Sequence, residues 1–92
     1  MFMAIATHHP HPDHAGDFVA HMHRVVEATS GAEGLISFDC VADEESGALL
    51  GVSKWVSREA FEAALPLIGA NAHLRRDEWT VGPDELRLLS EV

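Results

Sequence analysis

The apolar residues in the first third of the chain follow two different patterns, one typical of a strand and one typical of a helix. Residues 2–9 form a mostly apolar run that ends at a proline-containing loop, so we predict a strand there. Residues 14–29 then carry an apolar stripe at helical spacing, and Asp13 is a suitable N-cap for that helix. The stripe consists of Phe18, Met22, Val25, Val26 and Thr29.

Two strand patterns joined by a polar loop follow the first helix. Residues 35–42 and 48–56 are the predicted strands, and the acidic stretch 43–47 between them is typical of a hairpin loop. Since their apolar residues occupy both alternating sets of positions, both faces of the sheet are expected to need cover. We assign Ile36, Phe38 and Cys40 to one face of the second strand, and Leu35 and Val41 to the other. In the third strand Leu50, Val52 and Val56 alternate with Leu49, Gly51 and Trp55.

The last third of the chain contains a second helix and a final strand. Ser57 is a good N-cap for a helix over residues 58–69, and Pro66 within it predicts a kink or an early end. Residues 69–83 have no regular period, and residues 85–91 read as a strand.

The element order is that of a ferredoxin-like α+β fold, βαββαβ, with a four-stranded antiparallel sheet and two helices on one face. We expect one domain over residues 1–92. Two helices can cover only one face of the sheet, so the other apolar face must be buried elsewhere. We therefore expect a homodimer.

Charge and cysteine usage narrow the classes of partner. The formal net charge is −9, so the chain lacks the basic stripe that nucleic acids or an anionic membrane surface would require. It has no apolar run of eighteen residues, and its amino terminus does not read as a signal peptide. The single cysteine, Cys40, fits a reducing compartment, and we expect a cytoplasmic protein.

The residues 34–39 (GLISFD) and 54–61 (KWVSREAF) resemble the antibiotic biosynthesis monooxygenase domain of the dimeric α+β barrel superfamily. The most specific piece is the pattern Trp55-x-Ser57-x-Glu59-x-Phe61, and the resemblance covers essentially the whole chain. It implies two sheets that face each other across a dimer, and a pocket between each sheet and its helices. Members of the superfamily include cofactor-free oxygenases of polycyclic phenols, heme-degrading oxygenases and isomerases.

The resemblance implies a cofactor-independent monooxygenase for an aromatic, polyketide-like or quinone-type small molecule. A non-catalytic module that binds a small apolar ligand is the first alternative. An isomerase or lyase of the same fold is the second. Only the oxygenase would consume dioxygen with its substrate, an isomerase would convert its substrate without dioxygen, and a binding module would convert nothing.

A cofactor-free oxygenase needs a base for the phenol and donors for the resulting anion. We predict His9, His73 and Arg75 as the catalytic groups, because histidine titrates near neutral pH. Trp55 matches the tryptophan that lines the pocket in the oxygenase members, although a core tryptophan is the simpler interpretation. Trp79 either belongs to a lid or anchors the irregular segment to the body or the partner chain. The predicted pocket wall comprises Trp55, Phe18, Met22, Phe61, Leu65 and Trp79.

The sequence predicts neither a heme site nor a metal site. The heme-degrading members place an asparagine on the first strand and a histidine about ten positions beyond the tryptophan. Here Leu65 stands at the second place and the first strand has no asparagine. Four histidines lie within seven residues and could ligate zinc or nickel, but their spacing matches no established motif, so we predict a solvated loop. They are His8, His9, His11 and His14.

Overall fold

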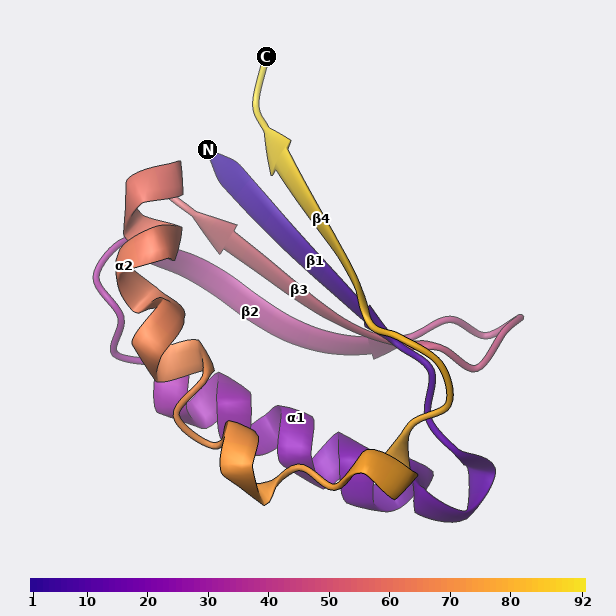
Figure 1. Cartoon of the computed structure of the whole chain (residues 1–92). Helices are drawn as coiled ribbons and strands as arrows, with labels where there is room; N and C mark the ends of the chain where they lie inside the picture. Colours follow the sequence, from indigo (N-terminus) through magenta and orange to yellow (C-terminus); the bar gives the residue numbers. More distant parts are fainter.

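The computed structural model describes residues 1–92 and contains the predicted order of elements (Figure 1). The elements are β1 (Phe2–His8), α1 (Ala15–Thr29), β2 (Leu35–Ala42), β3 (Leu49–Trp55), α2 (Arg58–Ile68) and β4 (Glu85–Ser90). Short 3₁₀ turns occupy Pro12–His14, Ala72–Leu74 and Asp77–Trp79. The predicted α+β class is confirmed. No predicted helix or strand boundary differs from the observed one by more than one residue.

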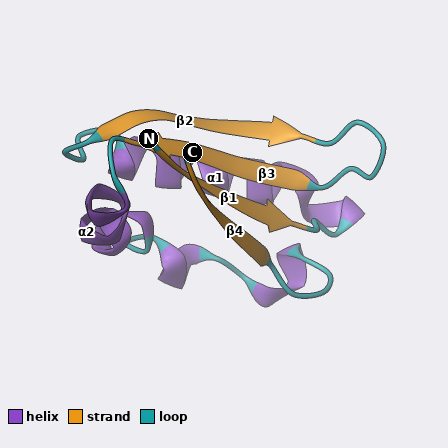
Figure 2. Ribbon diagram, turned by 90° about the horizontal axis from the view of Figure 1, so that it is seen from above, coloured by secondary structure: helices purple, strands orange, loops and turns teal.

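The four strands form one antiparallel sheet in the order β2-β3-β1-β4. Both helices lie on the same face of this sheet (Figures 1 and 2), as the ferredoxin-like pattern predicts. The segment after α2 runs back beside α1 before the chain turns into β4, at one edge of the sheet. No helix is long and apolar enough to cross a membrane.

The first side chains of β2 do not lie on the faces of the sheet that strict alternation predicted. Leu35 pairs with Trp55 and Ser37 with Lys54, so the register shifts at Ile36. An extra residue in one strand is a β-bulge, and it moves the side chains that follow to the opposite face of the sheet. Leu35 therefore packs against the helix-side core together with Phe38 and Cys40, while Ile36 is 54% exposed. The assignment of Ile36 to the face of Phe38 and Cys40 was wrong, because strict alternation takes no account of a bulge.

The two helix starts also differ from each other in how well they were predicted. Ser57 caps α2 as expected, because its Oγ accepts a hydrogen bond from the Ala60 N–H at 3.1 Å. Asp13 does not cap α1; it lies inside a 3₁₀ turn, and its own N–H donates to the His11 ring. The proline-rich loop takes up the tighter turn first, so α1 begins at Ala15.

The layer between sheet and helices contains two separate apolar clusters. We name the first the tryptophan core, which consists of Phe2, Ala4, Trp55, Phe61 and Ala64. The second, named the α1 cluster, consists of Phe18, Met22 and Trp79. Trp55 is completely buried, and its indole N–H donates to the Ser53 Oγ at 2.9 Å. The tryptophan core thus fills the α2 side of the layer without leaving space at Trp55.

Candidate functional site

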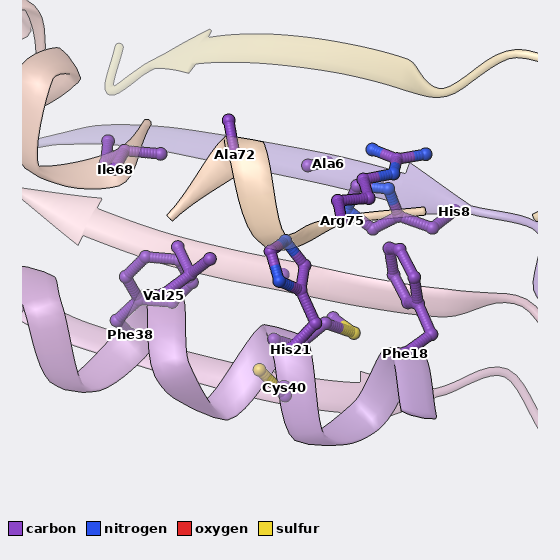
Figure 3. Close-up of a pocket in the computed structure, with 12 residues that line it drawn as sticks. Ala6, His8, Phe18, His21, Val25, Phe38, Cys40, Ile68, Ala72 and Arg75 are labelled. Carbon is purple, nitrogen blue, oxygen red and sulfur yellow. The ribbon is translucent and has the colours of Figure 1, made fainter. Parts of the chain in front are cut away.

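A cavity of about 230 Å³ lies beside the α1 cluster, between the sheet and α1 (Figure 3). The sheet contributes Ala6, His8, Phe38, Cys40 and Gly51. The helix α1 contributes Phe18, His21, Met22 and Val25, and the end of α2 and the segment after it contribute Ile68, Ala72 and Arg75. Most of these side chains are apolar, so the cavity suits a small apolar or aromatic molecule.

Small residues at three places explain why this part of the layer is hollow. Ala6 on β1 and Gly51 on β3 are paired neighbours in the sheet, and neither sends a bulky side chain toward α1. Ala72 lies on the opposite side of the cavity, in the segment after α2. A Cβ added at Gly51 would meet the Phe38 ring at 3.4 Å, which is an ordinary contact. The space is therefore set by residue size rather than by a strained backbone.

One end of the cavity holds a cluster of charged and ionisable groups. Arg75 donates to both carboxylate oxygens of Asp84, from Nη1 at 2.6 Å and from Nη2 at 3.0 Å. The His8 Nδ1 lies 3.0 Å from the Asp84 Oδ1, although its N–H direction is poorly aligned for a hydrogen bond. Figure 3 shows the His8 ring and the Arg75 guanidinium side by side next to the Phe18 ring, whose centre is 5.1 Å from Arg75 Cζ. Asp84 thus holds two cavity residues from different elements.

The ion pair changes the acid strength of both partners. Burial acts to raise the pKa of the Asp84 carboxyl, but the hydrogen bonds from Arg75 and the nearby His8 and Arg75 groups hold this pKa below its usual value. The hydrogen bond to Asp84 raises the pKa of Arg75 further. At neutral pH the guanidinium and the carboxylate are both charged, and the pair is stable.

His21 comes from the opposite side of the cavity and is 6% exposed. Its ring stands between the rings of Phe18 and Trp79, with centroids 5.9 and 6.0 Å away. The Nδ1 atom lies 3.4 Å from the Nη2 of Arg24, one turn along the helix. Burial and the nearby charges of Arg24, Arg75 and His8 lower the pKa of His21, so the ring is neutral at pH 7.

Three of the predicted site residues line the cavity, namely Phe18, Met22 and Arg75. Trp55 and Phe61 do not line it, because both lie in the tryptophan core, with ring centroids 5.9 Å apart. Leu65 lies on the outer side of α2 and is 48% exposed, so the second helix presents neither this side chain nor a histidine in its place to the cavity.

The remaining predicted residues lie outside the cavity. The His9 ring pairs with the Glu85 carboxylate at 3.0 Å on the surface, and His73 is exposed. Trp79 packs on Phe18 and Met22, and its backbone oxygen accepts from the His11 N–H at 2.8 Å. Trp79 therefore anchors the irregular segment to the body of the molecule, which was the simpler of the two interpretations.

Two histidines that line the cavity were missed, although each had a signal in the sequence. His8 follows Phe2, Ala4 and Ala6 at a period of two, so it shares their face of β1. His21 lies three residues after Phe18 and four before Val25, which places it within the apolar stripe of α1. Both were overlooked because the face of β1 was not assigned and no histidine was counted in the stripe.

The other groups of interest have individual partners. No group of three or more histidine, cysteine or acidic side chains is arranged to hold a metal ion. Two histidines of the loop after β1 have local contacts, since His11 accepts from the Asp13 N–H and His14 lies 3.1 Å from Asp17. Cys40 lines the cavity, where burial and the Asp39 charge raise the pKa of its thiol.

Comparison with known families identifies the relatives of this fold. The family model described as antibiotic biosynthesis monooxygenase matches residues 1–66, which is most of the chain. The chain belongs to this family. No protein with a curated function matches the sequence.

Solved structures of the antibiotic biosynthesis monooxygenase family and of similar proteins share the whole fold. Rv0793 from Mycobacterium tuberculosis is 22% identical with a TM-score of 0.83, covering 99% of this chain and 94% of its own. A structure described as antibiotic biosynthesis monooxygenase is 21% identical with a TM-score of 0.78, covering 100% and 99%. A variant of MhuD with two manganese protoporphyrin IX molecules bound per active site is 20% identical with a TM-score of 0.78, covering 100% and 95%. At these identities the likeness establishes the fold.

Proposed function

We propose that this protein is a cofactor-independent monooxygenase that oxidises a small phenol to a quinone, with one oxygen atom of dioxygen entering the product. The observation that carries the proposal is the mainly apolar cavity into which two histidines and an arginine project. An apolar cavity alone can bind an aromatic molecule, but a reaction also needs a proton acceptor and hydrogen-bond donors. His8, His21 and Arg75 supply such groups here. Membership of the antibiotic biosynthesis monooxygenase family supports the same reaction class.

The reaction balances without an added reductant. A phenol loses its hydroxyl proton to a base, and the electron-rich anion transfers an electron to dioxygen. The two radicals combine to form a carbon-bound peroxide, which loses water to give the quinone carbonyl. One dioxygen is consumed, one of its oxygen atoms enters the product, and the other leaves in water with the hydrogens of the phenol and the ring carbon. The substrate itself supplies the electrons.

The size of the cavity limits the substrate. Pockets for drug-sized ligands usually measure about 300–1,000 Å³, whereas this one measures about 230 Å³. The proposed substrate is therefore a flat molecule of one or two rings. The Phe18 and Phe38 rings provide aromatic walls for it, from α1 and from β2.

The proposed assembly is a homodimer through the face of the sheet that the helices leave bare. That face carries apolar side chains from all four strands, and β4 is exposed along its whole length. Its members include Ile5, Val41, Leu50, Val52 and Leu89. Val41 is 47% and Leu89 is 44% exposed in the single chain. A second copy of the same face would bury both.

Oxygen uptake tests the proposed reaction. The purified protein is mixed with 1-naphthol and 1,4-dihydroxynaphthalene, and dioxygen is followed with an electrode while products are identified by mass spectrometry. We expect uptake of one dioxygen per quinone formed. His21→Leu and Arg75→Gln should each lower the rate about tenfold or more, because each removes a polar group from the cavity. His23→Gln and Arg76→Gln are matched controls, since both side chains are exposed.

Other outcomes would contradict the oxygenase and favour its alternatives. Conversion of a phenol without dioxygen uptake would indicate an isomerase or lyase. Saturable quenching of tryptophan fluorescence without any conversion would indicate a binding module. Absence of both across the panel would exclude phenols of this size.

Sedimentation tests the proposed dimer. Val52 lies on the bare face, paired with Ile5 and Asp39 in the sheet. Val52→Glu should shift the protein from dimer to monomer at micromolar concentration, since an unpaired carboxylate in an apolar interface costs several kcal/mol, roughly 3–5. Leu67→Glu is the control, because Leu67 is 42% exposed on α2. A parent that is monomeric at micromolar concentration would exclude the dimer.

A further inference from the structure

We propose that the two cavity histidines hold opposite tautomers and so have opposite roles, with His8 as the base and His21 as a hydrogen-bond donor to the substrate oxygen. In this assignment Asp84 and Arg24 are positioning residues that act through His8 and His21. The assignment deepens the proposed oxygenase function and rests on it for the chemistry. The tautomers themselves can be measured without any substrate.

The tautomer of His21 follows from its neighbour on the same helix. A guanidinium has five N–H donors and no acceptor. The Arg24 Nη2 at 3.4 Å can therefore pair only with a His21 Nδ1 that carries a lone pair. A neutral ring then bears its proton on Nε2, so the second nitrogen of His21 is a donor.

The surroundings of His21 prevent the ring from gaining a second proton near neutral pH. The charged and titratable groups around the cavity are Arg24 on the helix of His21, His8 on β1, Arg75 in the segment after α2 and the Cys40 thiol on β2, whose pKa is raised. None of these is a carboxylate. The Nε atom of Arg24 is buried without a hydrogen-bond partner, and Arg24 has no carboxylate within ion-pair distance. His21 remains a neutral donor, which is the form that can stabilise a phenolate oxygen without binding its proton.

The environment of His8 favours the opposite tautomer. The Nδ1 atom of His8 lies 3.0 Å from a carboxylate oxygen of Asp84. A lone pair on Nδ1 would face that negative charge, whereas a proton on Nδ1 is attracted to it. The neutral ring therefore carries its proton on Nδ1 and leaves Nε2 as an acceptor. When Nε2 takes a proton, the resulting imidazolium lies beside Asp84, which also holds Arg75.

The two rings together form a proton acceptor and an oxyanion donor in one cavity. They enter it from β1 and from α1, on different sides (Figure 3). The phenol proton passes to the His8 Nε2, and the phenolate oxygen accepts a hydrogen bond from the His21 Nε2–H. The proton on His8 leaves with the water formed from the peroxide. A pair of groups with separated protonation states of this kind is the usual arrangement for acid–base chemistry.

Long-range ¹H–¹⁵N spectra of the histidine-labelled protein test the assignment directly. At pH 7.5 we expect the His21 signals of an Nε2–H ring and the His8 signals of an Nδ1–H ring. His21→Gln and His8→Gln assign the signals. Arg24→Met should shift His21 toward a mixture of the two tautomers, whereas His23→Gln should leave His21 unchanged. The same tautomer in both rings of the parent would overturn the assignment, even if every variant folds.

Kinetics separate the roles once a substrate is in hand. His8→Gln should lower kcat by about a hundredfold or more, because it removes the base. His21→Gln retains an N–H donor and should lower kcat less than tenfold, whereas His21→Leu should lower it more. Equal losses for the two His21 variants would overturn the donor role. If the parent consumes no dioxygen, the oxygenase proposal fails, while the tautomers are still decided by the spectra.

Discussion

The two ends of the layer between sheet and helices have the same architecture but different contents. At the α2 end, Trp55 is 0% exposed and packs with Phe2 and Phe61 in a filled core. At the α1 end, a cavity of about 230 Å³ remains where the sheet carries Ala6 and Gly51. Because β1 and β3 run through both ends, the strands themselves do not decide which end is hollow. Side-chain size along one face of two strands does.

The comparison also separates stability from chemistry. The tryptophan core contains only apolar residues, and the neighbouring Ser53 Oγ accepts from the Trp55 Nε1 and donates to the Ala4 carbonyl oxygen. The hollow end holds two histidines and an arginine tied to Asp84. Polar groups are costly inside a protein unless they are paired. Their placement around a space large enough for a ligand is the reason for proposing that this end serves binding, while the filled end holds the fold.

The largest expected effect comes from emptying the filled end. Trp55→Ala should lower the free energy of unfolding by about 3–5 kcal/mol, since it removes a fully buried side chain and leaves a cavity. Urea unfolding followed by circular dichroism measures this loss. Trp55→Phe, which keeps most of the volume, is the matched control and should lose less. A cost below about 1 kcal/mol for Trp55→Ala would contradict the filled core.

A matched pair of substitutions on one strand sharpens the contrast. Ala4 and Ala6 share a face of β1, but Ala4 lies in the tryptophan core and Ala6 lines the cavity. Ala4→Leu should destabilise the protein by about 1–3 kcal/mol through overpacking. Ala6→Leu should change stability by less than about 1 kcal/mol while weakening the binding of a two-ring phenol about tenfold or more.

Thermal unfolding and fluorescence titration of both variants measure the pair. Equal destabilisation would mean that the α1 end is as tightly packed as the α2 end. Unchanged phenol binding by a folded Ala6→Leu protein would place the ligand elsewhere.

The smallest expected effect is a loss of folding stability in mild acid. Folding lowers the pKa of His21 from the ordinary value of about 6.5. The unfolded chain therefore takes up this proton at a higher pH than the folded chain does. The stability gained from a neutral His21 is present above about pH 6.5 and is lost as the pH falls toward its folded pKa.

Urea unfolding at pH 7.5 and pH 5.5 checks this effect. His21→Gln should lose less stability between the two pH values than the parent does. His23→Gln should behave like the parent, because His23 is exposed. If the parent and His21→Gln have the same pH dependence, the ring is not held neutral by its surroundings.

Much of the fold could be read from the sequence because local signals agreed with one another. The helical stripe from Phe18 to Thr29, the Ser57 cap and the acidic hairpin loop each predicted the observed element. The register shift at Ile36 could not be predicted, because a bulge is fixed by pairing with β3 rather than by the residues of β2 alone. The Asp13 cap of α1 was predicted wrongly for a related reason, since the turn before the helix uses the His11 ring as its cap.

The candidate site was predictable only in part. Phe18, Met22 and Arg75 were found because residue type and helical spacing placed two of them on the inner face of α1 and an arginine in the nearby segment. Sequence also determined that the chain has many histidines, few cations and one face of its sheet without cover. Only the tertiary structure decided that His8 and His21 meet at one cavity, that His9 turns to Glu85, and that Trp55 fills the opposite end. The physical reason is that a cavity depends on side chains from β1, β2, β3 and α1 that become neighbours only when the sheet forms.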